Sequence, residues 1–228
     1  MLFLAVTLGF LVENQREHYI ERQRAHEFAE SLIADIEKDT AQLTSELKQI
    51  DFVASRIDTF RTLVQTKNTD DLPGGTLHYY ARFTSWYFSF NPNNATIEQL
   101  KSSGSLRYFK NKEVINAIAQ YDRISRTIKD LYNYEQPIIN RTIDLRNQIF
   151  NAVYFSPVWD FNTPRERIDS FMKSDIKLLD NNKAKLIELA NNCQLTLADY
   201  RHRKNDYQKA LKLGGDLIML LKKEYNLK

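Results

Sequence analysis

The chain has 228 residues, of which 43% are hydrophobic and 27% are charged, and its formal net charge is +3 at pH 7. Basic residues are spread among acidic ones, and so small an excess excludes a strongly basic nucleic-acid-binding protein. The 6 glycines and 5 prolines are too few for the turns of an all-β protein, and the single cysteine, Cys193, excludes an internal disulfide. The composition therefore favours a few long helices.

The N-terminal residues Met1 to Val12 form an uncharged apolar run that passes directly into charged residues from Glu13 onwards. A membrane-spanning helix needs about 20 apolar residues, and the run lacks the basic start and the cleavage site of a signal peptide. We therefore interpret residues 1–12 as the C-terminal part of a transmembrane helix that begins upstream of Met1. The predicted partner of this segment is a lipid bilayer. The alternative is a soluble protein with an apolar helix end.

A long helix is predicted over residues 13–65. From Ala29 to Val64 its apolar positions recur alternately every three and four residues, which is the spacing of a helix with a narrow apolar seam. Such a seam suits near-parallel packing against other long helices. The sequence Pro73-Gly74-Gly75 follows and predicts a turn.

The most aromatic stretch of the chain predicts a short helix over residues 77–90, because its rings recur at helical spacing. The favoured interpretation is a helix that closes one end of a bundle by burying large rings. The alternative is a surface that binds a protein partner or a ligand. The candidate residues for that surface are Tyr79, Tyr80, Phe83, Trp86, Tyr87 and Phe90.

Four more helices follow. A capping-box pattern at Thr96 predicts a short helix over residues 96–103, and helical spacing predicts a long one over residues 112–154, kinked but unbroken at Pro137. Thr163-Pro164 predicts a short helix over residues 164–179. The last long helix is predicted over residues 182–225, where Gly214-Gly215 indicates a kink or the close approach of another backbone.

These elements predict an all-α fold. We expect an elongated antiparallel bundle of three long helices with short connecting helices, which occupies residues 13–228 and follows the membrane segment 1–12.

Sequence motifs for catalysis or metal binding are weak. Asp199 and His202 match only part of a di-iron carboxylate pattern, which has no second copy in the chain. Cys193 has no acid–base partner beside it in sequence, and no phosphate-binding loop or nucleophile elbow occurs. We therefore predict no catalytic, cofactor-binding or metal-binding residues, and expect that the protein is not an enzyme.

Two stretches resemble an uncharacterised family of small single-pass membrane proteins from the Bacteroidota. The first is Phe10-Leu11-Val12-Glu13-Asn14-Gln15-Arg16-Glu17. The second is Asn91-Pro92, Thr96-Ile97-Glu98-Gln99-Leu100-Lys101-Ser102-Ser103-Gly104-Ser105-Leu106-Arg107 and Asn111-Lys112. In that family a basic N-terminus and a full membrane helix precede the first motif, and the part after Pro157 matches only in being helical. The resemblance implies an inner-membrane anchor and a periplasmic helical domain, and it implies no activity.

Three functions follow as hypotheses. The leading one is a membrane-anchored helical scaffold or accessory subunit that acts through contacts with a protein partner or a second copy of itself. The alternative is a periplasmic ligand-sensing bundle in which a small molecule enters near the aromatic stretch and Pro137. The third is an enzyme with an unrecognised helical site, which would require a cluster of titratable groups inside the bundle.

Overall fold

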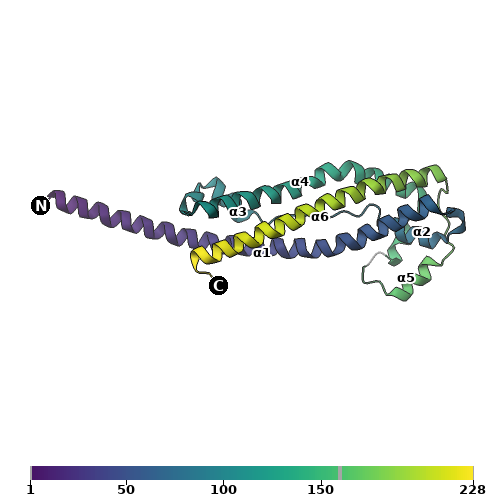
Figure 1. Ribbon diagram of the computed structural model, residues 1–228, viewed down its shortest axis with the longest axis horizontal. Coiled ribbons are helices and arrows are strands. Elements are labelled where there is room, and N and C mark those ends of the chain that lie inside the picture. The colour runs from purple at the N-terminus through teal and green to yellow at the C-terminus, as the bar shows by residue number, and fades with distance from the viewer. Residues whose placement is uncertain (1, 159–160, 228) are drawn as a thin grey trace. The chain divides into compact units, whose positions relative to one another are not determined.

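The computed structural model describes residues 2–158 and 161–227, with side chains from Thr7 onwards. The described chain is helical and contains no strand, which confirms the all-α prediction. The α-helices are α1 (Leu2–Thr66), α2 (Gly74–Ala81), α3 (Ala95–Ser102), α4 (Lys112–Ile149), α5 (Arg165–Met172) and α6 (Lys183–Tyr225) (Figure 1). Short 3₁₀ helices lie at Thr69–Asp71, Ser105–Tyr108 and Ala152–Val158.

The chain divides into two compact units, and α1, α4 and α6 each contribute to both. Unit 1 contains Met1–Thr44, Phe90–Lys129 and Gln208–Lys228, whereas unit 2 contains Ser45–Ser89 and Asp130–Tyr207. Each unit has its own buried apolar side chains. In unit 1 these include Ala29, Leu32, Ile36, Leu43, Leu100, Ile118, Tyr121, Leu217 and Leu221. In unit 2 they include Val53, Ile57, Phe60, Phe83, Leu145, Phe150, Leu189 and Tyr207.

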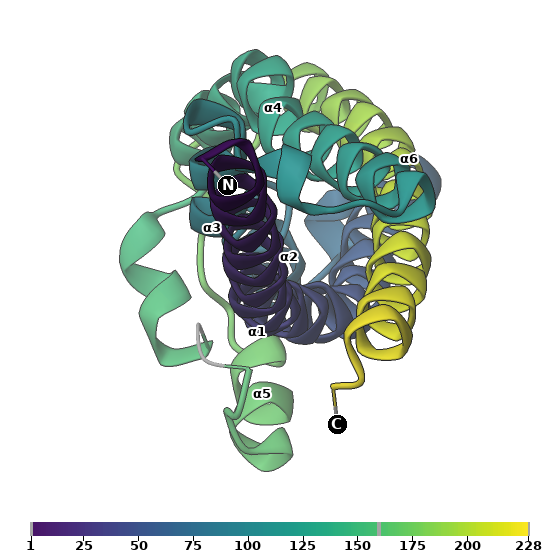
Figure 2. The ribbon, with the colours of Figure 1, turned by 90° about the vertical axis from the view of Figure 1, so that its left-hand side faces the viewer.

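Unit 1 is held together by close packing of its three helix segments. In both views the C-terminal part of α6 and the first part of α4 lie beside α1 (Figures 1 and 2). A Cβ atom built on Gly214 of α6 would lie 3.0 Å from Tyr121 of α4 and 3.1 Å from both Ile36 and Thr40 of α1. Gly214 therefore lies against side chains of α4 and α1, whereas a Cβ atom on Gly215 would meet nothing within 4 Å. The close approach of another backbone, which was one of the two outcomes that the sequence indicated, is not what these glycines mark.

Two acidic side chains of α1 tie the connection before α3 to unit 1. Asp39 is 1% exposed and accepts hydrogen bonds from the Asn93 backbone N–H at 2.7 Å and from the Tyr121 hydroxyl at 2.9 Å. Asp35 accepts one from the Thr96 hydroxyl at 2.7 Å. The predicted capping box at Thr96 is therefore wrong, because α3 begins at Ala95 and the hydroxyl bonds to another helix.

The predicted helix over residues 77–90 is also wrong in extent. α2 begins at Gly74 and ends at Ala81, and after a turn through Ser85 the chain is not helical up to Asn94. Gly74 and Gly75 form the start of α2 instead of a turn. The backbone after α5 packs so closely on them that a side chain would not fit. The Gly75 N–H donates to the Ser174 carbonyl at 3.0 Å, and a Cβ on Gly74 would lie 1.6 Å from the Ile176 carbonyl oxygen.

The long helices follow the predicted ones closely, but their buried faces are wider. α1 ends at Thr66, α4 begins at Lys112 and continues through Pro137, and α6 ends at Tyr225. α4 stops at Ile149, before a 3₁₀ helix that begins at Ala152, and α5 stops at Met172, so both predicted ends lie too far along the chain. In α1, Leu32, Val53 and Phe60 are fully buried beside the predicted seam, which gives the broad stripe of a globular helix.

No helix of the described chain has a stretch that is both long and apolar enough to cross a membrane. The structure therefore does not support the transmembrane segment predicted over residues 1–12. The physical reason is the charged sequence that begins at Glu13 and continues with Arg16 and Glu17. Met1 lies outside the described residues. Of the other apolar side chains in this segment, Leu8, Phe10, Leu11 and Val12 are 55–77% exposed.

Candidate functional site

The six aromatic candidates occupy different environments. Five belong to unit 2, whereas Phe90 belongs to unit 1. Tyr79, Phe83 and Phe90 are buried, Tyr80 and Trp86 are half-buried, and Tyr87 is 47% exposed. In unit 2, four of the five rings form one cluster with Phe161, whereas Tyr87 packs against Tyr132. Within the cluster, Phe83 packs 5.7 Å from Tyr79 and Trp86 packs 4.7 Å from Phe161, measured between ring centroids.

His78 of α2 is a core residue that packs against a different set of rings. Its Nδ1 donates to the Gly74 carbonyl at 2.8 Å, and its ring meets Phe150 and Tyr154 edge to face. Burial lowers the pKa of His78, although the Gly74 carbonyl acts in the opposite direction. The imidazole is therefore neutral at pH 7 and is placed for packing rather than for proton transfer.

Two buried arginines lie against aromatic rings of unit 2. Arg82 follows α2 and is 2% exposed, with its Cζ atom 4.1 Å above the Phe83 ring centroid and 5.1 Å from that of Tyr79. Arg146 lies in the last turn of α4 and is 9% exposed, with its Cζ atom 5.1 Å from the Phe155 centroid. Aromatic faces stabilise buried cations, but they supply no counter-charge.

The two arginines line one cavity of about 420 Å³. Arg146 donates to the Ser85 hydroxyl and to the Asn147 side-chain oxygen, the latter at 3.4 Å. Burial lowers the pKa of Arg146, yet the guanidinium keeps its charge because an arginine pKa starts above 12. The wall contains no acidic residue among the described ones and consists of Arg82, Ser85, Trp86, Tyr87, Ile143 and Arg146.

The segment that carries Ser85 and Trp86 is fixed from several sides. The Tyr200 hydroxyl of α6 donates to the Trp86 carbonyl at 2.5 Å, and the Tyr200 ring lies 5.5 Å from Phe88. The Tyr87 ring lies 5.4 Å from Tyr132 of α4. The cavity mouth is therefore aromatic and its backbone is held in place by hydrogen bonds.

No family model, curated protein or solved structure matches this chain. The resemblance to a family of single-pass membrane proteins therefore stays a prediction.

Sequence analysis identified the aromatic residues of this cavity, Trp86 and Tyr87, but did not identify its two arginines. Arg82 stood in the aromatic stretch but was not singled out, and Arg146 is 61 residues from Ser85, to which it donates. One signal for Arg146 was available. The positions three and four residues before and after it in sequence offer no carboxylate, since they are Thr142, Ile143, Ile149 and Phe150.

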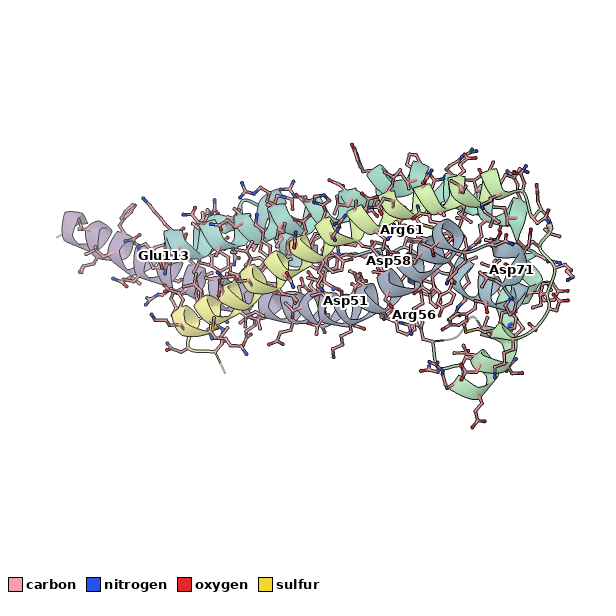
Figure 3. All side chains as sticks on the ribbon, turned by 45° about the vertical axis from the view of Figure 1, so that its right-hand side comes forward. Asp51, Arg56, Asp58, Arg61, Asp71 and Glu113 are labelled. Carbon is pink, nitrogen blue, oxygen red and sulfur yellow. The ribbon has the colours of Figure 1, made fainter. Side chains whose placement is uncertain are left out.

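A second hollow of unit 2, about 430 Å³ in volume, lies along α1 and α6. Figure 3 shows three of its charged residues, Asp51, Asp58 and Arg61, along the same stretch of α1. Asp51 accepts from Lys204 at 2.7 Å, and Asp58 accepts from Arg61 at 2.6 Å. These two pairs neutralise four of the five charged lining residues and leave Arg201, which is exposed to solvent. Because an exposed charge is solvated, this cavity is a weaker candidate for a charged ligand than the Arg146 cavity.

The residues weighed for catalysis do not form a reactive cluster. Burial raises the pKa of the Cys193 thiol to about 12, so the thiolate that would act as a nucleophile is not formed at neutral pH. Among the described residues, no three His, Cys, Asp or Glu side chains come close enough to hold a metal ion.

Proposed function

We propose that the protein is a helical scaffold or accessory subunit that acts through protein–protein contacts without catalysis. In this proposal α1, α4 and α6 form an elongated antiparallel bundle, and the mouth of the Arg146 cavity is the contact face. The observation that carries the proposal is the exposure of Tyr87 beside the half-buried Trp86 and the buried Arg146. Tyrosine, tryptophan and arginine are the residues that dominate binding energy at protein interfaces.

The test is affinity purification of the full chain from its native cells, with quantitative mass spectrometry of the retained proteins and sizing of the complex. Tyr87→Ser should lower recovery of a stoichiometric partner about tenfold or more, as expected for a central contact residue. Tyr134→Ser is the matched control, because Tyr134 is 83% exposed and lies two positions from Tyr132 on α4, about 200° around the helix. Equal recovery with both variants, or no stoichiometric partner, contradicts the proposal.

The proposal includes attachment to a lipid bilayer through residues 1–12. Its support is the exposure of Phe10 and Val12, which are 77% and 68% exposed near the N-terminal end of α1. The inner-membrane location and the periplasmic side rest on the family resemblance alone and stay predictions. The purified chain should float with liposomes, and Phe10→Ser with Leu11→Ser should abolish flotation. A wild-type chain that stays in the unbound fraction contradicts this part.

A further inference from the structure

Arg146 is a buried charge for which the described part of the chain supplies no counter-ion. It is 9% exposed, and its described partners are the neutral Ser85 and Asn147 side chains, while its Nε atom is buried without a hydrogen-bond partner. No acidic side chain among the described residues forms an ion pair with it. The carbonyl groups at the C-terminal end of α4 lower the cost of the cation, but a buried charge stays unfavourable until an opposite charge pairs with it.

The cavity beside Arg146 has the size and lining of a small-molecule site. Its volume of about 420 Å³ lies in the range in which proteins hold small ligands. Trp86, Tyr87 and Ile143 provide apolar wall, and Arg82 adds a second cation that is held against aromatic rings. Apolar walls around a single unpaired guanidinium favour an organic monoanion over a strongly hydrated inorganic ion.

We propose that this cavity binds a small organic acid. The carboxylate pairs with the guanidinium of Arg146 and accepts a hydrogen bond from the Ser85 hydroxyl, and the apolar or aromatic body packs against Trp86, Tyr87 and Ile143. A planar guanidinium presents parallel N–H donors that match the two oxygens of a carboxylate. The inference goes beyond the proposed protein contact and does not depend on it.

The test uses the purified full chain and three probes: benzoate, its neutral isostere benzamide, and inorganic phosphate. Isothermal titration calorimetry should show benzoate binding at one site, and benzoate should raise the melting temperature in a concentration-dependent way. Benzamide should bind about tenfold more weakly or worse, because it lacks the charge that pairs with Arg146. Benzamide binding as tightly as benzoate, phosphate binding more tightly, or no benzoate binding overturns the proposal.

Two variants locate the site. Arg146→Gln should abolish benzoate binding, whereas Arg141→Gln should leave it unchanged, because Arg141 lies on the same helix but is exposed and pairs with Glu188. Ile143→Trp should also abolish binding, because the larger side chain fills the cavity while both arginines are kept. Ile143 is only half-buried, so the protein can accommodate the substitution. Benzoate binding retained in both Arg146→Gln and Ile143→Trp overturns the assignment.

The melting temperature of Arg146→Gln without ligand separates a binding role from a structural one. If Arg146 is kept for a ligand, removing its unpaired charge leaves the melting temperature unchanged or raises it. A clear fall in the melting temperature would show that Arg146 is a structural residue and would count against the proposal. This measurement needs neither the protein partner nor the bilayer. A negative result for the organic-acid site is therefore distinguishable from a negative result for the proposed protein contact or membrane attachment.

Discussion

At the residue scale, Gly214 and Gly215 are neighbours in α6 with opposite surroundings. A Cβ on Gly214 would meet Tyr121, Ile36 and Thr40 at 3.0–3.1 Å, whereas a Cβ on Gly215 meets nothing within 4 Å. Alanine stabilises a helix interior by about 1 kcal/mol relative to glycine, but overpacking a filled site costs about 1–3 kcal/mol. We expect Gly215→Ala to raise the free energy of unfolding and Gly214→Ala to lower it, measured by urea denaturation. Equal effects would mean that α6 does not approach its neighbours as described.

At the element scale, a buried ion pair joins α4 to α6 within unit 2. Arg203 is 1% exposed and donates to Glu135 and, at 3.3 Å, to the Tyr207 hydroxyl. Removing one partner of such a pair costs about 3–5 kcal/mol, whereas replacing both by apolar residues is often nearly neutral. We therefore expect Arg203→Met to be strongly destabilised and the double variant Arg203→Met with Glu135→Leu to recover most of the loss, measured by urea denaturation.

The Arg203→Met variant also has a predicted pH dependence. Burial already raises the pKa of Glu135 while Arg203 opposes the shift, so losing Arg203 should raise this pKa further. The folded state then keeps a proton that the unfolded state releases, and stability falls as pH rises above the ordinary glutamate pKa of about 4.3. A double variant no more stable than Arg203→Met, or an Arg203→Met variant with a wild-type pH profile, would contradict this account of the pair.

At the scale of the whole molecule, stability is unevenly distributed along α1. From Thr7 to Arg24 its side chains are exposed or half-buried, and the first buried one is Ala25. A helix segment of this length is marginally stable in water without packing. In hydrogen exchange of the purified chain, backbone amides of residues 7–19 should exchange quickly, whereas those of residues 25–64 should be protected. Equal protection in both stretches would show that another molecule covers the first one.

The sequence by itself determined the helical class and the approximate span of the long helices. Apolar residues at a period between three and four are a local signal, and they located the C-terminal end of α1 and both ends of α6 within a residue or two. The same signal misjudged α2, because Gly74 and Gly75 normally mark a turn. Only the backbone near Ser174 and Ile176, about a hundred residues away, makes two glycines the residues that fit there.

The candidate cavity also has one part that the sequence indicated and another that only the tertiary structure decided. An aromatic stretch is visible in sequence because its residues are contiguous, so Trp86 and Tyr87 could be named beforehand. Burial of each ring and the position of Arg146 against Ser85 were decided only by tertiary packing, because these groups are brought together from α4, α6 and the segment after α2. A charge becomes a binding group when packing removes water and leaves it unpaired, and that depends on neighbours in space rather than in sequence.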